Sequence, residues 1–233
     1  MKRTRYFLLL FALVFLISGC SMKWQPSWQT GVNDIPTPQS TSLLNKAQKD
    51  FNRASDEKSL RDSIQSFENT LAENPGDYQA LKQLSTQYIL LGTAYTNSRK
   101  QKSDHFHQAM IFAERAMYTN PDFRKRVDAG STPWDAAETL SAREVEAMFF
   151  WVTALQYEFK EGMSLPGKII NIDWLQHALV FLDRIESVSP DFGDGAVDFA
   201  KVICYYALPK IKGGSKDLGD GYMRKAMAKG DQW

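Results

Sequence analysis

The segment HQAMIFAERAMYTNPDF, residues 107–123, contains the pattern that decides the fold of this chain. Its small residues Ala109, Ala113 and Ala116 are spaced i, i+4 and i+7, so they share one face of a helix. Small side chains on that face let a second helix approach closely. Pro121 then ends the helix, because it cannot donate a hydrogen bond to the preceding turn. The segment therefore predicts one helix of a packed helix pair.

The same spacing recurs twice along the chain. Residues at x, x+4 and x+7 are followed by a proline at x+12, and an aromatic residue follows that proline within three positions. This order is the second-helix signature of the tetratricopeptide repeat. The three copies are Ser63, Phe67, Thr70, Pro75 and Tyr78; Ala109, Ala113, Ala116, Pro121 and Phe123; and Ala178, Leu182, Ile185, Pro190 and Phe192.

The spacing between the copies predicts an irregular array. The three prolines are 46 and 69 residues apart, whereas a regular array repeats about every 34 residues. Between them, a capping box at Ser141–Glu144 opens a helical run that ends near Glu161. No stretch alternates with the period of two that strands require. The expected fold class is all-α, an irregular helix-pair (TPR-like) solenoid, and the alternative is an ordinary helical bundle.

The N-terminus has the three segments of a bacterial lipoprotein signal. Basic residues precede an apolar run, Phe7–Ile17, which is too short for a membrane span and ends in ISGCS. This ending resembles a lipobox, in which Cys20 is lipidated and becomes the mature N-terminus. The alternative is an uncleaved signal anchor with an incidental cysteine. Ser21 stands where an aspartate is associated with inner-membrane retention, so we expect a periplasmic protein anchored in the inner leaflet of the outer membrane.

Three parts of the chain are expected from these features. Residues 1–19 are the signal peptide, residues 20–42 a lipidated tether rich in proline and hydroxyl groups, and residues 43–233 the TPR-like helical domain. Trp24 and Trp28 lie in the tether, and the sequence leaves open whether they rest on the membrane or dock on the domain.

Composition argues against several classes of function. The formal charge of +1 falls to −2 when the three basic residues of the signal peptide are removed, so no basic patch indicates nucleic acid. Three scattered histidines do not form a metal-ligand set, and no cofactor is expected. Cys204, in an apolar run, is expected to be a buried small hydrophobe. No nucleophile with a matching base stands out, so we expect no enzyme.

Residues 144–230 contain the pair Phe150-Trp151, the turn SPDFGDGA at 189–196, and Tyr205-Tyr206-Ala207 followed by Pro209 and Gly213-Gly214. With these motifs the C-terminal half resembles the T-component (TatT) family of tripartite ATP-independent periplasmic (TRAP) transporters, which has a Tyr-Trp pair at the position of Phe150-Trp151. The resemblance is faint over residues 43–118. The family usually has further helices after the Gly-Gly element, so we expect either that the chain is truncated relative to the family or that another subunit or the tether covers the exposed apolar face.

The resemblance implies an accessory transport component. Its members are periplasmic lipoproteins that form trimers with a pore, associate with the transporter's solute-binding subunit, and are inferred to carry apolar or amphiphilic organic solutes. It implies that aromatic residues line the passage; the candidates are Phe150, Trp151, Tyr157, Tyr205 and Tyr206. The alternative for Phe149, Phe150, Trp151 and Tyr157 is that they pack in the core. The alternative hypothesis is a repeat-type lipoprotein scaffold that assembles envelope or outer-membrane proteins by gripping a peptide or partner helix.

Overall fold

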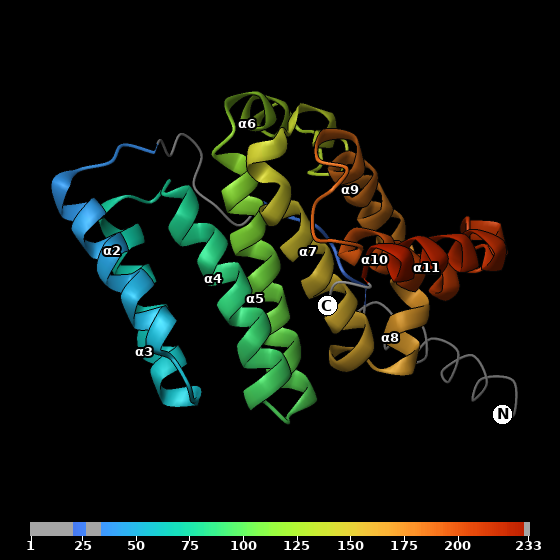
Figure 1. Cartoon of the computed structure of the whole chain (residues 1–233), viewed down its shortest axis with the longest axis horizontal. Coiled ribbons are helices and arrows are strands. Elements are labelled where there is room, and N and C mark those ends of the chain that lie inside the picture. The colour runs from blue at the N-terminus through green and yellow to red at the C-terminus, as the bar shows by residue number, and fades with distance from the viewer. Residues whose placement is uncertain (1–20, 27–33, 231–233) are drawn as a thin grey trace, which may run out of the picture.

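The computed structural model describes residues 21–26 and 34–230, and the regular secondary structure of these residues is all helical, with no strand among them (Figure 1). The all-α prediction is therefore confirmed. Cys20 and Trp28 lie outside the described residues, so the structure does not bear on their predicted roles.

Ten α-helices and five short 3-10 or π segments follow one another along the described chain. The α-helices are α2 (Pro38–Arg53), α3 (Glu57–Glu73), α4 (Tyr78–Leu90), α5 (Arg99–Tyr118), α6 (Pro121–Asp128), α7 (Val145–Tyr157), α8 (Leu165–Ile170), α9 (Trp174–Val188), α10 (Ala196–Ala207) and α11 (Lys216–Gly230). The short segments are η1 (Leu91–Tyr95), η2 (Ala137–Thr139), η3 (Ala142–Glu144), η4 (Glu158–Gly162) and η5 (Lys210–Lys212).

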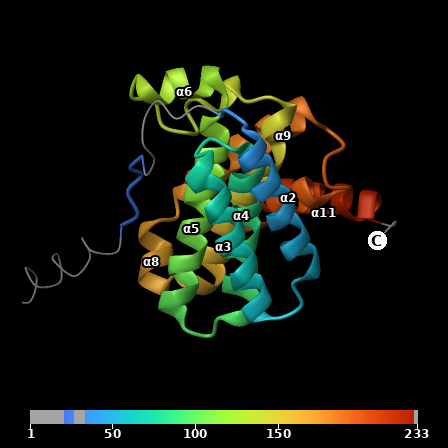
Figure 2. The same ribbon diagram turned by 90° about the vertical axis from the view of Figure 1, so that its left-hand side faces the viewer.

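The long helices pack as successive pairs. Helices α2 and α3, α4 and α5, α7 and α9, and α10 and α11 lie against each other, and the pairs follow one another across the molecule (Figures 1 and 2). The second members α3, α5 and α9 carry the three copies of the repeat spacing. All nine residues at x, x+4 and x+7 have 0% exposure, so this face is where each helix meets its neighbours.

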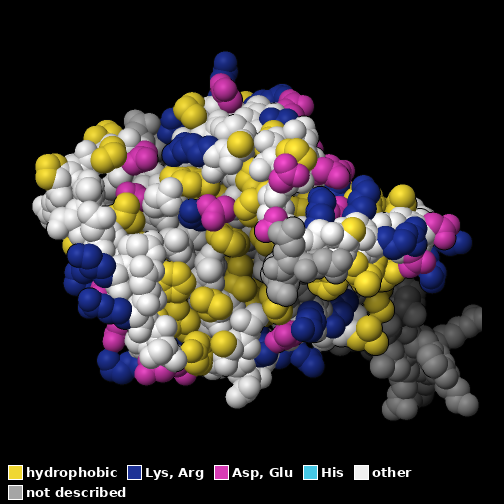
Figure 3. Space-filling view, in the orientation of Figure 1, with side chains coloured by type: hydrophobic (Ala, Val, Ile, Leu, Met, Phe, Trp, Pro, Cys, Tyr) yellow, Lys and Arg dark blue, Asp and Glu magenta, His cyan; other side chains and the backbone are white. Residues whose placement is uncertain are grey.

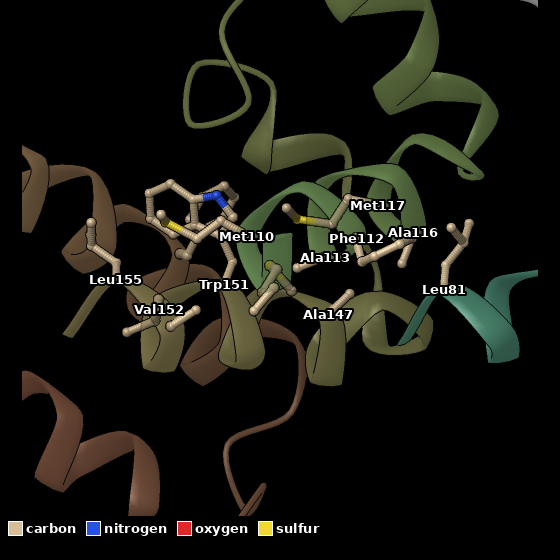
Figure 4. Packing of buried hydrophobic residues seen from close by; sticks show 14 of the residues in the cluster. Leu81, Met110, Phe112, Ala113, Ala116, Met117, Ala147, Trp151, Val152 and Leu155 are labelled. Atoms are coloured by element: carbon tan, nitrogen blue, oxygen red, sulfur yellow. The ribbon is translucent and has the colours of Figure 1, made fainter. Parts of the chain in front are cut away.

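The centre of the core lies where α5 packs against α7 (Figure 4). Ala113 and Ala116 of α5 and Ala147 of α7 are fully buried, and their small side chains allow the two helices to come close. Trp151 fills the space beside them and is itself fully buried. Small residues at the crossing and one large ring beside it give the close packing that is usual in protein interiors.

The predicted helix boundaries follow from local chemistry. Asn120 caps α6 by accepting hydrogen bonds from the backbone of Asp122 and Phe123, and Pro121 occupies the first turn, where its missing N–H costs nothing. The ring of Phe123 is fully buried over this joint. The capping box at Ser141 is present and opens the helical run through η3, α7 and η4, which ends at Gly162. This confirms the end predicted near Glu161.

The segment expected to be a tether is partly built into the domain. Helix α2 begins at Pro38 with Thr37 as its cap, so helical structure starts before residue 43. Residues 21–26 run beside α5 and α8 (Figure 2), where the backbone N–H of Met22 donates to Asn171 and the indole of Trp24 donates to Glu114. Trp24 thus docks on the domain. In the part of the chain that the structure describes, no helix combines the length and apolar character needed to cross a membrane.

Candidate ligand-binding groove

An apolar groove of about 850 Å³ lies between α7, α10 and α11. Each helix contributes one stripe of residues at helical spacing, which places the stripe on a single face. The stripes are Phe149, Thr153, Gln156, Tyr157 and Lys160 from α7 and η4; Ala196, Phe199, Ala200 and Ile203 from α10; and Met223, Ala226, Met227 and Gly230 from α11, with Asp194 and Gly195 closing one end. Hydrophobic side chains gather over this part of the surface in Figure 3.

Helix α7 supplies a groove wall because it is apolar nearly all the way round. One face, with Trp151, Val152 and Leu155, is fully buried in the core. The opposite face carries Phe149 and Thr153, which are only partly buried and line the groove. A helix of this composition is stable when both faces are covered or when one faces an apolar cavity.

Two polar side chains of the walls, Thr153 and Gln156, form hydrogen bonds within the protein. The Thr153 hydroxyl donates to the carbonyl of Phe149 at 2.8 Å. The Gln156 amide donates to the carbonyl of Ala200 at 2.8 Å and to Cys204 Sγ at 3.5 Å. Because these groups have internal partners, the middle of the groove presents mainly carbon to a ligand.

Charged groups stand only at the two ends of the groove. Lys160 lies at one end, with its Nζ 5.5 Å from the centre of the Tyr157 ring and 3.5 Å from Glu161 Oε1. Asp194 lies at the other end, beside the start of α10. An apolar trough with a cation at one end suits an elongated amphiphilic molecule whose anionic group meets Lys160.

Two glycines allow α11 to form the third wall. Gly195 has a φ of 96°, and a Cβ there would lie 2.8 Å from the carbonyl oxygen of Ala226, so only glycine permits the close approach of α11. Gly214 sits under the Leu208 carbonyl, where a Cβ would overlap the backbone. Its N–H donates to the Pro209 carbonyl at 3.0 Å, so the Gly-Gly element forms a tight hydrogen-bonded turn between α10 and α11.

Side-chain contacts hold α11 against α10. The rings of Tyr205 and Tyr222 stack with centroids 5.6 Å apart, and Lys229 pairs with Asp198 at 2.9 Å. Lys201 lies beneath the Tyr222 ring, its Nζ 4.9 Å from the ring centre.

Lys201 also ties α10 to α9. It is only 1% exposed, and it pairs with Asp183 at 2.6 Å and Glu186 at 2.5 Å. Burial disfavours its charge, but the bonds to these two carboxylates outweigh burial and raise the pKa of Lys201 above its usual value. Lys201 therefore stays charged and joins the last helices to the rest of the stack.

The structure does not bring the five sequence-predicted lining residues together. Only Tyr157 lines the groove, where its ring also stacks on Phe106. Phe150 is partly buried against the core, Tyr205 stacks on Tyr222, and Tyr206 is 49% exposed with its hydroxyl donating to Asp220. These side chains point to three different neighbourhoods.

Trp151 is placed in the core and cannot reach the groove. It has no exposed surface, its indole N–H donates to Glu114 Oε1 at 2.8 Å, and its ring contacts Trp174 and Phe181. A passage lined by this ring would require the α5–α7 interface to open. Its role here is packing.

The groove residues that sequence reasoning did not single out are chiefly Phe199, Met223 and Met227. The sequence does contain a pattern that marks these faces, because α10 and α11 both repeat apolar or small residues at i, i+3, i+4 and i+7. That spacing equally describes a helix buried against its neighbour. Only the exposure of Phe199 (50%) and Met227 (65%) shows that these stripes are partly uncovered.

A second polar site, also not predicted, surrounds Glu114. This carboxylate is 5% exposed, and it accepts the indole N–H groups of Trp151 at 2.8 Å and Trp24 at 3.1 Å. Burial raises the pKa of Glu114 to about 7, although both indole bonds act in the opposite direction. The site fixes residues 21–26 to α5.

Two side chains of the kinds that serve in catalysis or metal binding, Cys204 and His177, are both packed against other parts of the protein. Cys204 is fully buried, and burial raises the pKa of its thiol to about 11, so it is not a reactive nucleophile. His177 stacks on Trp134 with ring centres 3.8 Å apart. Across residues 21–26 and 34–230, no cluster of three or more His, Cys, Asp or Glu residues could hold a metal ion.

Comparison with protein-family models finds none that matches this chain, and comparison with curated proteins finds no match either. The resemblance of residues 144–230 to the T-component family therefore remains a hypothesis carried by the quoted motifs.

Proposed function

We propose that this chain is a non-enzymatic, lipid-anchored periplasmic binding protein whose α7–α10–α11 groove holds an apolar or amphiphilic organic molecule. The proposal rests on the groove itself. Its volume of about 850 Å³ lies within the range of small-molecule sites, about 300–1,000 Å³, and its walls are mainly carbon, with the charged residues Lys160 and Asp194 at the ends. Met223 and Met227 provide flexible side chains that adapt to different ligand shapes.

We also propose, from the family resemblance, that the protein acts as an accessory T component of a TRAP-type transport system. Its partner would be the periplasmic solute-binding subunit, and a homotrimer would provide the continuous passage. A binding protein for this role needs a shaped apolar surface and no reacting groups, which agrees with the composition of the groove. Cross-linking in whole cells to a solute-binding subunit encoded in the same operon tests this partner.

Binding of the fluorescent fatty acid cis-parinaric acid tests the groove. Phe199→Ser removes an aromatic wall residue that is 50% exposed, and Leu218→Ser removes an aliphatic residue that is 49% exposed and does not line the groove. A lost aromatic contact costs about 1.5–3 kcal/mol, so Phe199→Ser should weaken binding roughly tenfold or more. Leu218→Ser should leave binding unchanged. Equal affinities for the two variants would exclude the groove as the ligand site.

The scaffold alternative is supported by one observation. Phe199 and Met227 are strongly exposed at the groove, and such residues can anchor an amphipathic helix as well as a small molecule. Native mass spectrometry of the purified mature protein separates the two functions. A bound lipid-like mass supports the transport role, whereas a bound peptide supports the scaffold.

A further inference from the structure

The segment that follows Cys20 is fixed to one corner of the domain. The N–H of Met22 donates to Asn171 Oδ1 at 2.6 Å, and Asn171 is itself 3% exposed with its amide donating to the Gly167 carbonyl at 2.9 Å. Trp24 adds its bond to Glu114. The chain is therefore held at the C-terminal end of α8, not free to swing.

This attachment limits where a lipid on Cys20 can be. Cys20 is two residues from Met22, and two residues span at most about 7 Å. If Cys20 is acylated, as the proposed function assumes, the acyl chains must enter the bilayer close to the end of α8. The surface around α8 then faces the membrane.

Helix α8 exposes two aliphatic side chains on one face. Leu165 is 71% exposed and Ile169 is 66% exposed, and they are separated by four positions, one helical turn. Single exposed aliphatic residues are common on protein surfaces. Two exposed aliphatic residues on the same helical turn, next to a predicted acylation site, form a small apolar surface.

The η5 turn extends this apolar surface. Ile211 is 92% exposed at the middle of the turn. The turn lies beside the connection between α8 and α9, because Lys212 pairs with Asp173 and the Gln176 amide donates to the Lys212 carbonyl at 2.9 Å. The η5 turn and the connection between α8 and α9, separated by 36 to 39 positions in sequence at these two contacts, therefore lie side by side.

The charges around this surface are mainly positive. Lys23, Lys168 and Lys210 lie on residues 21–26, α8 and η5, and within the described residues no carboxylate forms an ion pair with them. The acidic neighbours are already paired, Glu161 with Lys102 and Asp173 with Lys212. Uncompensated lysines beside exposed aliphatic residues complement a bilayer that contains anionic lipids.

We propose that α8 and η5 form a membrane-contacting surface, with Leu165, Ile169 and Ile211 among the lipid chains and the lysines at anionic head groups. The inference rests on the proposed function for the acylation of Cys20. It adds a fixed orientation: the domain would lie on the membrane through this corner.

This orientation connects the membrane to the groove. The Nζ of Lys168 on α8 donates to the carbonyl of Lys160 at 3.2 Å, and Lys160 marks one end of the groove. The Lys160 end would thus lie beside the lipid head groups, where an amphiphile could exchange between the bilayer and the protein.

A polarity-sensitive nitrobenzoxadiazole label on single cysteines tests the surface in the full chain. Ile169→Cys carries the label on α8, and Ile35→Cys, with the same 66% exposure, is the matched control. Ile35 comes three residues before α2, which lies on the other side of the molecule from α8 (Figure 1). Cys204 is fully buried and should not react. In vesicles of phosphatidylethanolamine and phosphatidylglycerol, the label at 169 should shift to the blue and be quenched by nitroxide lipids, whereas the label at 35 should do neither.

The other outcomes distinguish membrane contact by α8 from acylation of Cys20. A label at 169 that stays in water while mass spectrometry shows acylated Cys20 would overturn the surface and leave the anchor intact. If Cys20 is not acylated, its free thiol would also take the label, so the measurement is repeated with Cys20→Ser in the same chain. In that chain a blue shift on adding anionic but not zwitterionic vesicles would still support the surface, and no shift would overturn it. A blue shift that follows protein concentration without vesicles would assign α8 to contact with a second copy and also overturn the proposal.

Discussion

The buried carboxyl of Glu114 should make the folded state less stable as pH rises. Its pKa is raised to about 7 in the folded protein from an ordinary 4.5, because burial opposes the charge. Between these values the folded chain keeps a proton that the unfolded chain has lost, so rising pH favours unfolding. Stability from this group is present below about pH 4.5 and is lost as pH approaches about 7. A raised pKa of this size corresponds to roughly 3 kcal/mol.

Glu114→Gln is the perturbation that isolates this effect. Glutamine cannot lose a proton, and its single carbonyl oxygen still accepts one of the two indole N–H groups. Losing the second hydrogen bond costs about 1 kcal/mol. Near pH 8 the variant should therefore be more stable than the wild type by roughly 2 kcal/mol, from a gain of about 3 kcal/mol less that bond. Near pH 4.5 this advantage should disappear.

Urea unfolding followed by far-UV circular dichroism at several pH values gives the measurement. The relevant quantity is the difference in unfolding free energy between variant and wild type, since other titrating groups cancel in it. His105 and His177 are among these, because burial lowers their pKa and makes stability rise with pH. Glu73→Gln, on the exposed side of α3, controls for the loss of one charge. A difference that stays constant from about pH 4.5 to 8 would refute the reasoning.

Two further substitutions test the packing that builds the fold. Gly213→Ala places a Cβ in open space at a φ of 91°, so it should lower the free energy of unfolding by about 1–2 kcal/mol. Gly214→Ala drives a Cβ into the Leu208 carbonyl and should lower it by more than about 2 kcal/mol. Hydrogen exchange should show lost protection in α11 for Gly214→Ala; equal protection in both variants would contradict the tight turn. Ala113→Leu at the α5–α7 crossing should cost about 1–3 kcal/mol and lower Tm, whereas Ala72→Leu on an exposed face of α3 should not. Equal melting temperatures for Ala113→Leu and Ala72→Leu would mean that the α5–α7 crossing accommodates a larger side chain.

Local signals explain why so much of the fold was predictable. The spacing of Ala109, Ala113 and Ala116 depends only on helix geometry, and the same geometry selects the packed face once the helix forms. Pro121 and the capping box at Ser141 act within a single turn of chain. Such signals do not need a distant partner, so the sequence displays them directly.

The groove could not be predicted with the same success, because burial depends on which helices come together. Trp151 and Phe149 are two positions apart on α7, yet one is enclosed by α5 and α9 and the other faces the groove. Both read as apolar positions of a helix that is apolar all round. A prediction based on aromatic character alone therefore combined buried core residues such as Trp151 with groove residues such as Tyr157.

Residues 21–26 show the same limit for the N-terminal segment. Their proline and polar composition is typical of a tether, and nothing local identifies a docking site. The site is formed by Asn171 and Glu114, which lie far along the chain and meet Met22 and Trp24 only after the helices stack.

The sequence by itself determined that this chain folds into paired helices, where several of them begin and end, and which face of α3, α5 and α9 is buried. These properties follow from backbone geometry and from side chains within one or two turns. The tertiary structure decided which apolar stripes remain uncovered, that α7, α10 and α11 enclose a groove, and that Glu114 lies inside. These properties depend on contacts between residues distant in sequence, since each helix's exposure is set by the neighbours that pack against it.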